Sequence, residues 1–239
     1  MTKVLPCINI QQITAKIISK VQQSLRPYCY MLFTTSNKVL LLKVVIHLAA
    51  FLPLLNLYYL AFNDQLGADP VQEVIHFTGI GAFNLLLVTL TVSPIAKKFK
   101  LGYLLQIRRL LGIYTFSYAL MHLFNFLVFD LQLAWSLFFS EVVKRPYITI
   151  GMIAFVLLTT LAITSLNSIK RNMGKSWQSL HNYSYFIAML VSVHFYWSVK
   201  SEIISPLFYM LLTVALLAFR YKKIKTLILS IFVKKIRTK

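Results

Sequence analysis

The chain has 239 residues, of which 58% are hydrophobic and 13% are charged. A water-soluble domain of this length needs more charged residues to cover its surface, so the composition excludes an ordinary soluble protein. The formal net charge is +19, but the basic residues occur in several short segments between apolar runs, which argues against one nucleic-acid-binding face.

Six apolar runs are long enough to cross the roughly 30 Å of hydrocarbon in a bilayer. They cover residues 39–62, 75–95, 110–131, 147–166, 177–199 and 203–219. We therefore expect an all-α integral membrane protein in which residues 39–220 form a bundle of six transmembrane helices. The short loops favour antiparallel packing of neighbouring helices. Residues 221–239 are expected to form a basic cytoplasmic tail.

The segment before the first run, residues 1–38, has apolar residues at helical spacing with lysine and arginine between them. This pattern predicts either an amphipathic helix on the anionic inner leaflet or a poorly ordered tail, with equal weight. Two later signals predict helix starts. Asp69 is expected to cap a helix that begins at Pro70, and Pro146 is expected to occupy the first turn of the fourth span.

The orientation in the membrane follows from the basic residues. With the amino terminus inside, three of the 25 lysines and arginines fall on the outer side, namely Lys144, Arg145 and Lys200, and the other 22 fall inside. All six aspartates and glutamates fall outside. The positive-inside rule therefore predicts that both termini are cytoplasmic.

Histidines are the residues in these spans that can carry chemistry. All five lie within or at the edge of an apolar run: His47, His76, His122, His181 and His194. Ionisable groups in lipid are costly and usually mark a function, although a single buried histidine is more often structural. A proton relay generally combines histidine with carboxylates, and no acidic residue lies deep in a span. Neutral imidazoles without carboxylates suit axial ligation of haem iron.

Helix geometry groups these histidines by depth. His122 lies 13 residues after Arg109 in the third span, and His194 lies 13 residues after His181 in the fifth, which runs in the same direction. At about 1.5 Å per residue, His122 and His194 share an outer level, and Arg109 and His181 share an inner level. The outer pair is therefore our preferred clamp for one haem.

The other candidates have alternatives of comparable weight. His181 is about 140° from His194 around a straight helix, so it serves a different cofactor or is not a haem ligand unless the helix is kinked. His76 and His47 are either additional haem contacts or structural residues. Arg108 and Arg109, at the mouth of a span, suit the phosphate of a flavin or the propionates of a haem, although lipid headgroups also explain them.

Several motifs resemble those of one known family. They are LGADP at 66–70, HFTG at 76–79, RRLLG at 108–112, HL at 122–123, RPY at 145–147, GKSWQSLHNY at 174–183 and HFYWSVK at 194–200. Over about residues 38–223 the chain resembles the MsrQ family of haem-binding membrane subunits, which have a ferric-reductase-like transmembrane domain. Residues 1–37 have no counterpart in this resemblance.

The resemblance implies cofactors, partners and a location. It implies b-type haem and FMN, a place in the bacterial inner membrane, and electrons from the quinol pool or a cytosolic flavin reductase. These electrons would pass to MsrP, a periplasmic molybdopterin subunit that repairs oxidised methionine in proteins. It also implies that His122, His181 and His194 are the haem ligands. The wider superfamily usually has two histidines in the third span, where Arg109 or its neighbour takes the inner position, which leaves room for a flavin.

The sequence is thus interpreted as an electron-transfer subunit rather than a catalytic one. No glycine-rich dinucleotide fingerprint is present, so a separate donor is expected. The alternatives are a stand-alone transmembrane ferric reductase and a histidine-based proton or solute transporter. The missing intramembrane carboxylates and the lack of a repeated pair of broken helices argue against a transporter. No internal repeat stands out along the chain.

Overall fold

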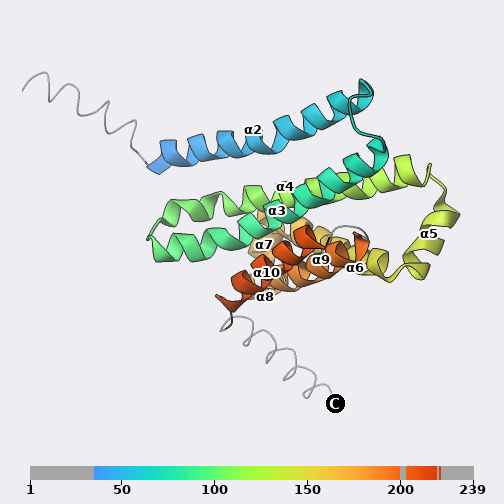
Figure 1. Cartoon of the computed structure of the whole chain (residues 1–239). Coiled ribbons are helices and arrows are strands. Elements are labelled where there is room, and N and C mark those ends of the chain that lie inside the picture. Colours follow the sequence, from blue (N-terminus) through green and yellow to red (C-terminus); the bar gives the residue numbers. More distant parts are fainter. Residues whose placement is uncertain (1–34, 200–202, 220, 222–239) are drawn as a thin grey trace, which may run out of the picture. The chain divides into compact units, whose positions relative to one another are not determined.

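The computed structural model describes residues 35–199, 203–219 and 221, and these residues are helical with short connections and contain no strand (Figure 1). Residues 1–34 of the predicted amphipathic or poorly ordered segment, and nearly all of the basic tail, lie outside the described residues; residues 35–38 begin α2. The chain divides into two units, residues 1–45 and 46–239. The first unit contributes only the beginning of helix α2 (Thr35–Phe62) to the described residues, so the site and its supports belong to the second unit.

Four helical segments are long and apolar enough to cross a membrane, namely Ser36–Phe62, Pro70–Lys98, Gly102–Asp130 and Pro146–Thr164. The first, second and fourth segments are α2, α3 (Pro70–Lys98) and α6 (Pro146–Thr164). The third segment consists of the 3-10 turn η1 (Gly102–Gln106), α4 (Arg108–Asn125) and the π-helical turn η2 (Phe126–Asp130). Four of the six expected spans are thereby confirmed by length and composition. The full count of six and the orientation of the termini stay predictions.

The fifth expected span is divided rather than continuous. Residues 177–199 contain the end of α8 (Lys175–His181) and all of α9 (Ser184–Ser198), separated at Asn182 and Tyr183. At the break the amide of Tyr183 donates to the carbonyl of Leu180, an i to i−3 bond that tightens the backbone. The last expected span is α10 (Ile204–Ala218), a shorter apolar helix, and α5 (Trp135–Lys144) and α7 (Asn167–Met173) lie in the connections.

The predicted helix starts are confirmed at two places. Asp69 Oδ1 accepts a hydrogen bond from the amide of Gln72 at 3.0 Å, and Pro70 opens α3. Pro146 opens α6, where its missing amide hydrogen costs nothing because the first turn has no intrahelical acceptor for it. Both starts are at the same end of the bundle, and they set the depth at which α3 and α6 begin.

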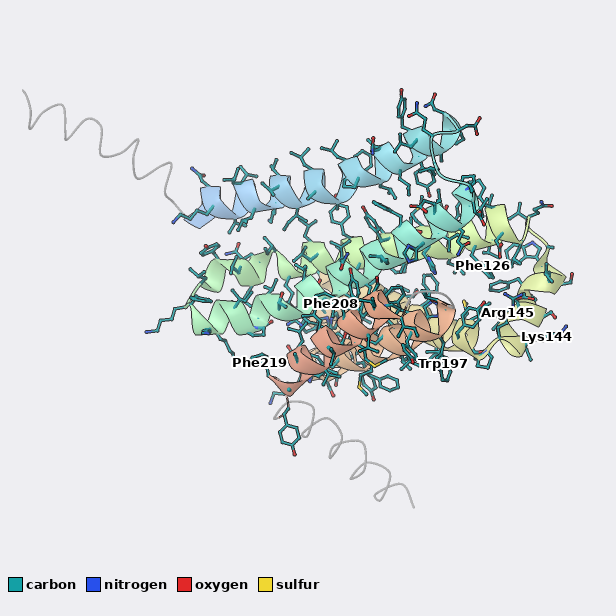
Figure 2. All side chains as sticks on the ribbon, viewed as in Figure 1. Phe126, Lys144, Arg145, Trp197, Phe208 and Phe219 are labelled. Carbon is teal, nitrogen blue, oxygen red and sulfur yellow. The ribbon has the colours of Figure 1, made fainter. Side chains whose placement is uncertain are left out.

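Two antiparallel helix pairs form the centre of the second unit. Helix α3 packs most extensively on α4, and α6 packs most extensively on α9, with α10 also against α9 (Figure 1). A buried apolar cluster joins α3, α6 and α9 and consists of Leu86, Leu90, Ala154, Leu158, Leu161, Tyr185, Ile187 and Ala188. Side chains on the outer faces of α2 and α10 are apolar and exposed, including Phe208, as expected where lipid is the solvent (Figure 2).

Polar contacts join α2 to α4 inside this apolar surrounding. The Tyr118 hydroxyl donates to the carbonyl of Ala50 at 2.6 Å, and the Tyr58 hydroxyl donates to Asn125 Oδ1 at 2.8 Å. Asn125 is fully buried, and its side-chain amide reaches Thr78 on α3. Hydrogen bonds between helices in lipid hold neighbouring helices in register, and these bonds fix the helix that carries His122.

Candidate functional site

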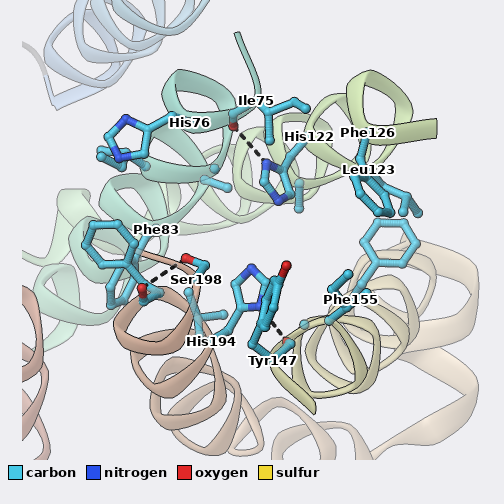
Figure 3. A pocket seen from close by; sticks show the side chains of 18 of the residues that line it. Ile75, His76, Phe83, His122, Leu123, Phe126, Tyr147, Phe155, His194 and Ser198 are labelled. Carbon is cyan, nitrogen blue, oxygen red and sulfur yellow. Dashed lines mark hydrogen bonds between the residues drawn. The ribbon is translucent and has the colours of Figure 1, made fainter. Parts of the chain in front are cut away.

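A cavity of about 910 Å³ lies between α3, α4, α6 and α9. Its volume is in the range of pockets that hold a cofactor, roughly 300–1,000 Å³. The side chains around its middle are mostly apolar and include Phe83, Leu86, Phe155 and Leu158. Two histidines, His122 and His194, project into it from opposite sides (Figure 3).

His122 is held by helix α3. Its Nδ1 lies 2.9 Å from the carbonyl oxygen of Ile75. A carbonyl accepts but cannot donate, so Nδ1 carries the proton and Nε2 of the neutral ring has a free lone pair. The ring lies against Gly79, where an added Cβ would be 3.0 Å from ring atoms of His122. Helix α3 therefore both orients the imidazole and leaves space for it.

His194 is held in the same manner by helix α6. Its Nδ1 lies 2.7 Å from the carbonyl oxygen of Tyr147 and donates to it (Figure 3). An added Cβ at Gly151 would be 2.8 Å from ring atoms of His194. The Nε2 atom of this ring is again the free ligand atom. Both histidines thus present a lone pair with the other nitrogen anchored, which is the usual arrangement of metal-binding histidine.

The distance between the two imidazole rings suits a metal ion bound between them. Their ring centroids are 6.2 Å apart and their planes are at 86°. Two metal–nitrogen bonds of about 2 Å in line, plus the distance from each nitrogen to its ring centre, account for a separation of this size. The apolar cavity beside the pair has the volume of a cofactor pocket. The residues present therefore fit a planar iron porphyrin with two axial histidines.

The arrangement repeats along the sequence after 72 residues. The interval relates the ligand, the carbonyl that anchors it and the glycine it lies against: His122 to His194, Ile75 to Tyr147, and Gly79 to Gly151. Identical residues at the same interval occur inside α3 and α6: Ala82 and Ala154, Phe83 and Phe155, Leu85 and Leu157, and Leu86 and Leu158. The expectation of no internal repeat is therefore corrected. The repeat is weak in sequence because few positions are identical, and η1 links one pair whereas α7 and α8 link the other.

The outer end of the cavity is polar. His76 lines it, with its ring centroid 6.2 Å from that of Phe195. Figure 3 shows the Tyr147 ring beside His194 with its hydroxyl directed into the cavity. Arg145 is the only lysine or arginine among the described residues that line the cavity, and its Nη1 donates to the Tyr147 hydroxyl at 3.1 Å. Arg145 also pairs with Glu141.

Arg145 lies between α5 and α6 and is labelled beside Lys144 at the right of Figure 2. The hydrogen bond to Tyr147 raises the pKa of Arg145, so its guanidinium stays cationic. Sequence reasoning did not assign a site role to Arg145, Tyr147, Gly79 or Gly151. The first two appear in the RPY motif and Gly79 in the HFTG motif, but the motifs alone do not say that these residues face a cavity.

The inner-level residues lie apart from this cavity. Neither His47 nor His181 is among the described residues that line it. The His181 ring stacks on Trp177 with centroids 4.1 Å apart, and its Nε2 is 3.3 Å from the Thr164 hydroxyl. His47 pairs instead with the hydroxyl of Tyr114 on α4.

Basic side chains gather near His181. Lys170 lies over the Trp177 ring, 4.6 Å from its centroid. Arg109 Nη1 donates to Asn167 Oδ1, and Arg108 begins α4 beside it. Trp177 Nε1 also donates to the carbonyl of Thr164 at 2.9 Å, which ties α8 to the end of α6. The inner level therefore offers cations and one histidine, and not a facing pair of imidazoles.

The helices around the cavity also match a known protein family. Residues 78–192 match the family described as ferric reductase like transmembrane component, and so include most of α3, all of α4 and α6, and most of α9. The fold and the match define a ferric-reductase-like membrane protein.

The chain also has relatives of high identity. It is 43% identical over 192 residues to the protein-methionine-sulfoxide reductase heme-binding subunit MsrQ of Cronobacter sakazakii, covering 80% of this chain and 96% of that one. It is 43% identical over 192 residues, with the same coverage, to the protein of the same name from Klebsiella pneumoniae strain 342. The chain belongs to the MsrQ family.

Proposed function

We propose that the chain is a membrane electron-transfer subunit that holds a b-type haem between His122 and His194. The observation that carries this proposal is the facing pair of imidazoles, 6.2 Å apart, each with Nδ1 bonded to a carbonyl and Nε2 directed to a shared cavity. Membership of a family whose relatives are named heme-binding subunits of protein-methionine-sulfoxide reductase supports the same function.

The chain's own contribution is to hold, orient and shield the cofactor. A haem held by His122 and His194 would supply one-electron chemistry. His122 and His194 bind from different helix pairs, so the site also joins the two halves of the bundle. Apolar side chains such as Phe83 and Phe155 keep water from the centre of the cavity, and His76 with Arg145 at the polar outer end suits contacts to propionate groups.

The inner level is proposed as a second cofactor site. Arg108 and Arg109 are suited to bind the phosphate of FMN or the propionate of a haem, and Lys170 adds a third cation close to His181. His181 is proposed to serve this inner cofactor, either as a ligand of a second haem or beside a flavin. The pairing of His47 with Tyr114 favours a structural role for His47.

The proposed route runs from the cytoplasmic to the outer face of the bacterial inner membrane. Electrons enter from the quinol pool or a cytosolic flavin reductase and leave to MsrP, the separate molybdopterin subunit that reduces methionine sulfoxide in proteins. Both termini are proposed to be cytoplasmic, as the distribution of lysine and arginine indicates. Catalysis on the oxidised protein belongs to the partner and not to this chain.

The test is cofactor content followed by electron delivery. Chain purified from membranes is expected to contain b-type haem by pyridine haemochrome, to be reducible with dithionite, and to retain FMN. Absence of haem after expression in haem-sufficient cells contradicts the proposal. In liposomes, the reduced haem is expected to reoxidise on addition of methionine sulfoxide only when the molybdopterin subunit is present. Rapid reoxidation by ferric chelate without that subunit would indicate a stand-alone ferric reductase instead.

A further inference from the structure

We propose that Gly79 and Gly151 are matched positioning residues, each required so that a ligand histidine can lie against the neighbouring helix and aim Nε2 at the cofactor. The inference rests on the proposed haem site at His122 and His194. It extends that site to two residues of the cavity lining that have no side-chain ligand atom of their own.

Each glycine lies one helical turn after the carbonyl that anchors the histidine. Ile75 and Gly79 are four residues apart on α3, and Tyr147 and Gly151 are four residues apart on α6. In an α-helix the carbonyl of residue i accepts the amide of residue i+4. The carbonyl that anchors each histidine is thus covered on its own helix by the glycine four residues later. An incoming imidazole must pass that position to reach the oxygen.

Neither glycine has room for a side chain beside the histidine ring. At Gly79 an added Cβ would be 3.0 Å from Cε1 and Nδ1 of His122, and at Gly151 it would be 2.8 Å from the same atoms of His194. The contacting atoms are not the end of a flexible side chain that could move away, because each imidazole ring is held by its Nδ1 hydrogen bond. To make room, the His122 ring must shift by a few tenths of an ångström and the His194 ring by more, and such a shift stretches the hydrogen bond or turns Nε2 away. Both changes weaken ligation.

The same arrangement of histidine, carbonyl and glycine occurs twice in the chain. The interval of 72 residues carries the histidine, the carbonyl and the glycine together from one helix pair to the other. Glycine inside a helix lowers helix stability relative to alanine, so two glycines at equivalent places need a local reason. The close contact with an imidazole ring explains the glycine at both Gly79 and Gly151. Gly81 on α3 has a different reason, because an added Cβ there would lie 2.5 Å from the Tyr118 ring, whereas Gly112 on α4 has open space where its Cβ would lie.

The experiment compares three alanine substitutions in the full chain purified from membranes. Gly79→Ala and Gly151→Ala are expected to lower haem per chain by about tenfold, the scale of losing a group that orients a metal ligand. The haem that remains is expected to show altered low-spin EPR g-values, because the ring planes change. Gly112→Ala is the matched control and is expected to keep the haem content and EPR spectrum of the parent. Parent haem content and g-values in both glycine variants would overturn the inference.

A double-mutant cycle covers the case in which a variant accumulates poorly. Thermal unfolding is measured for Gly151→Ala with His194 present and again with His194→Ala. If the added Cβ acts through the ring, Gly151→Ala lowers Tm only when His194 is present. An equal fall in Tm in both backgrounds would overturn the inference.

The same variants separate this inference from the proposed function. Loss of haem in His122→Ala and His194→Ala, together with full haem in both glycine variants, would overturn the role of the glycines alone. Full haem in the histidine variants themselves would remove the proposed site and the glycine roles with it.

Discussion

The outer and inner levels of the helix bundle differ in how the two halves of the repeat are used. At the outer level each half supplies the same three parts, a histidine, an anchoring carbonyl and a glycine, and the result is two imidazoles that face each other. At the inner level the interval of 72 residues relates Arg109 to His181, so one half supplies a guanidinium. Equivalent halves give two facing imidazoles, which suit the proposed haem. Unequal halves give a guanidinium and one imidazole, which suit the proposed inner cofactor.

The surroundings of the two levels agree with this difference. Neutral imidazoles are cheaper to keep in an apolar cavity than charged groups, so the outer pair can lie among Phe83, Leu86 and Phe155. Arg109 and Lys170 are near helix ends, where a charged group can reach water or headgroups. Depth in the bundle therefore separates the neutral ligands from the cations, and each level is suited to a different chemistry.

The largest expected effect comes from breaking the symmetric pair. His122→Ala and His194→Ala are each expected to remove nearly all of the haem at the outer site, since one axial ligand alone does not hold the cofactor in the two-sided clamp. The double variant is expected to be no worse than either single variant, because the two residues act as one unit. Haem content by pyridine haemochrome and low-spin EPR measure the effect.

His181→Ala is the comparison for this pair. It is expected to leave the EPR signal of the outer haem in place, with loss confined to an inner cofactor. If His181→Ala removed the outer signal as completely as His194→Ala, the separation of the two levels would be wrong.

The fold and the grouping of the histidines were largely accessible from the sequence. Apolar length predicted the four spans that the structure confirms. The rise per residue predicted that His122 and His194 share a level, which their close approach in the structure matches. The break at Asn182 and Tyr183 was not accessible. It contains neither proline nor glycine, and it follows an α8 that is tied to α6 by Trp177.

The supports of the site were also beyond sequence reasoning. A glycine that makes room for a ring is indistinguishable, in one sequence, from a glycine with open space beside it, as Gly151 and Gly112 show. The anchoring groups at Ile75 and Tyr147 are backbone carbonyls, and side-chain identity does not predict them. Only the placement of α3 against α4 and of α6 against α9 reveals these roles.

The second prediction sharpens the assignment of the inner level. Arg108→Ala/Arg109→Ala is expected to lower the FMN retained by the purified chain by about tenfold or more, because the loss of even one charge-assisted hydrogen bond to a phosphate costs about 1.5–3 kcal/mol. Haem at the outer site is expected to be unchanged. Flavin fluorescence after acid release measures the first quantity, and the haemochrome spectrum measures the second.

The control for this prediction removes the same charge elsewhere on the inner side. Lys97→Ala/Lys98→Ala takes two cations from the last turn of α3 and is expected to leave flavin retention unchanged. Equal flavin loss in both double variants would mean that the basic inner surface acts through its overall charge, and not through the two arginines that begin α4.

The smallest expected effect concerns the polar outer end, where the halves of the repeat also differ because Tyr147 stands where the other half has Ile75. Arg145 lines the cavity from this side and keeps its positive charge. A nearby cation favours the reduced, less positive state of a haem, so Arg145→Gln is expected to lower the midpoint potential. Arg145 is exposed and paired with Glu141, so the fall is expected to be only about 10–40 mV. Lys144→Gln is the control, because it removes a neighbouring charge that does not line the cavity. The haem midpoint potential of this variant, measured in the same spectroelectrochemical titration, is expected to equal that of the parent within error. An equal fall in both variants would mean that the effect comes from the overall surface charge and not from the mouth of the cavity.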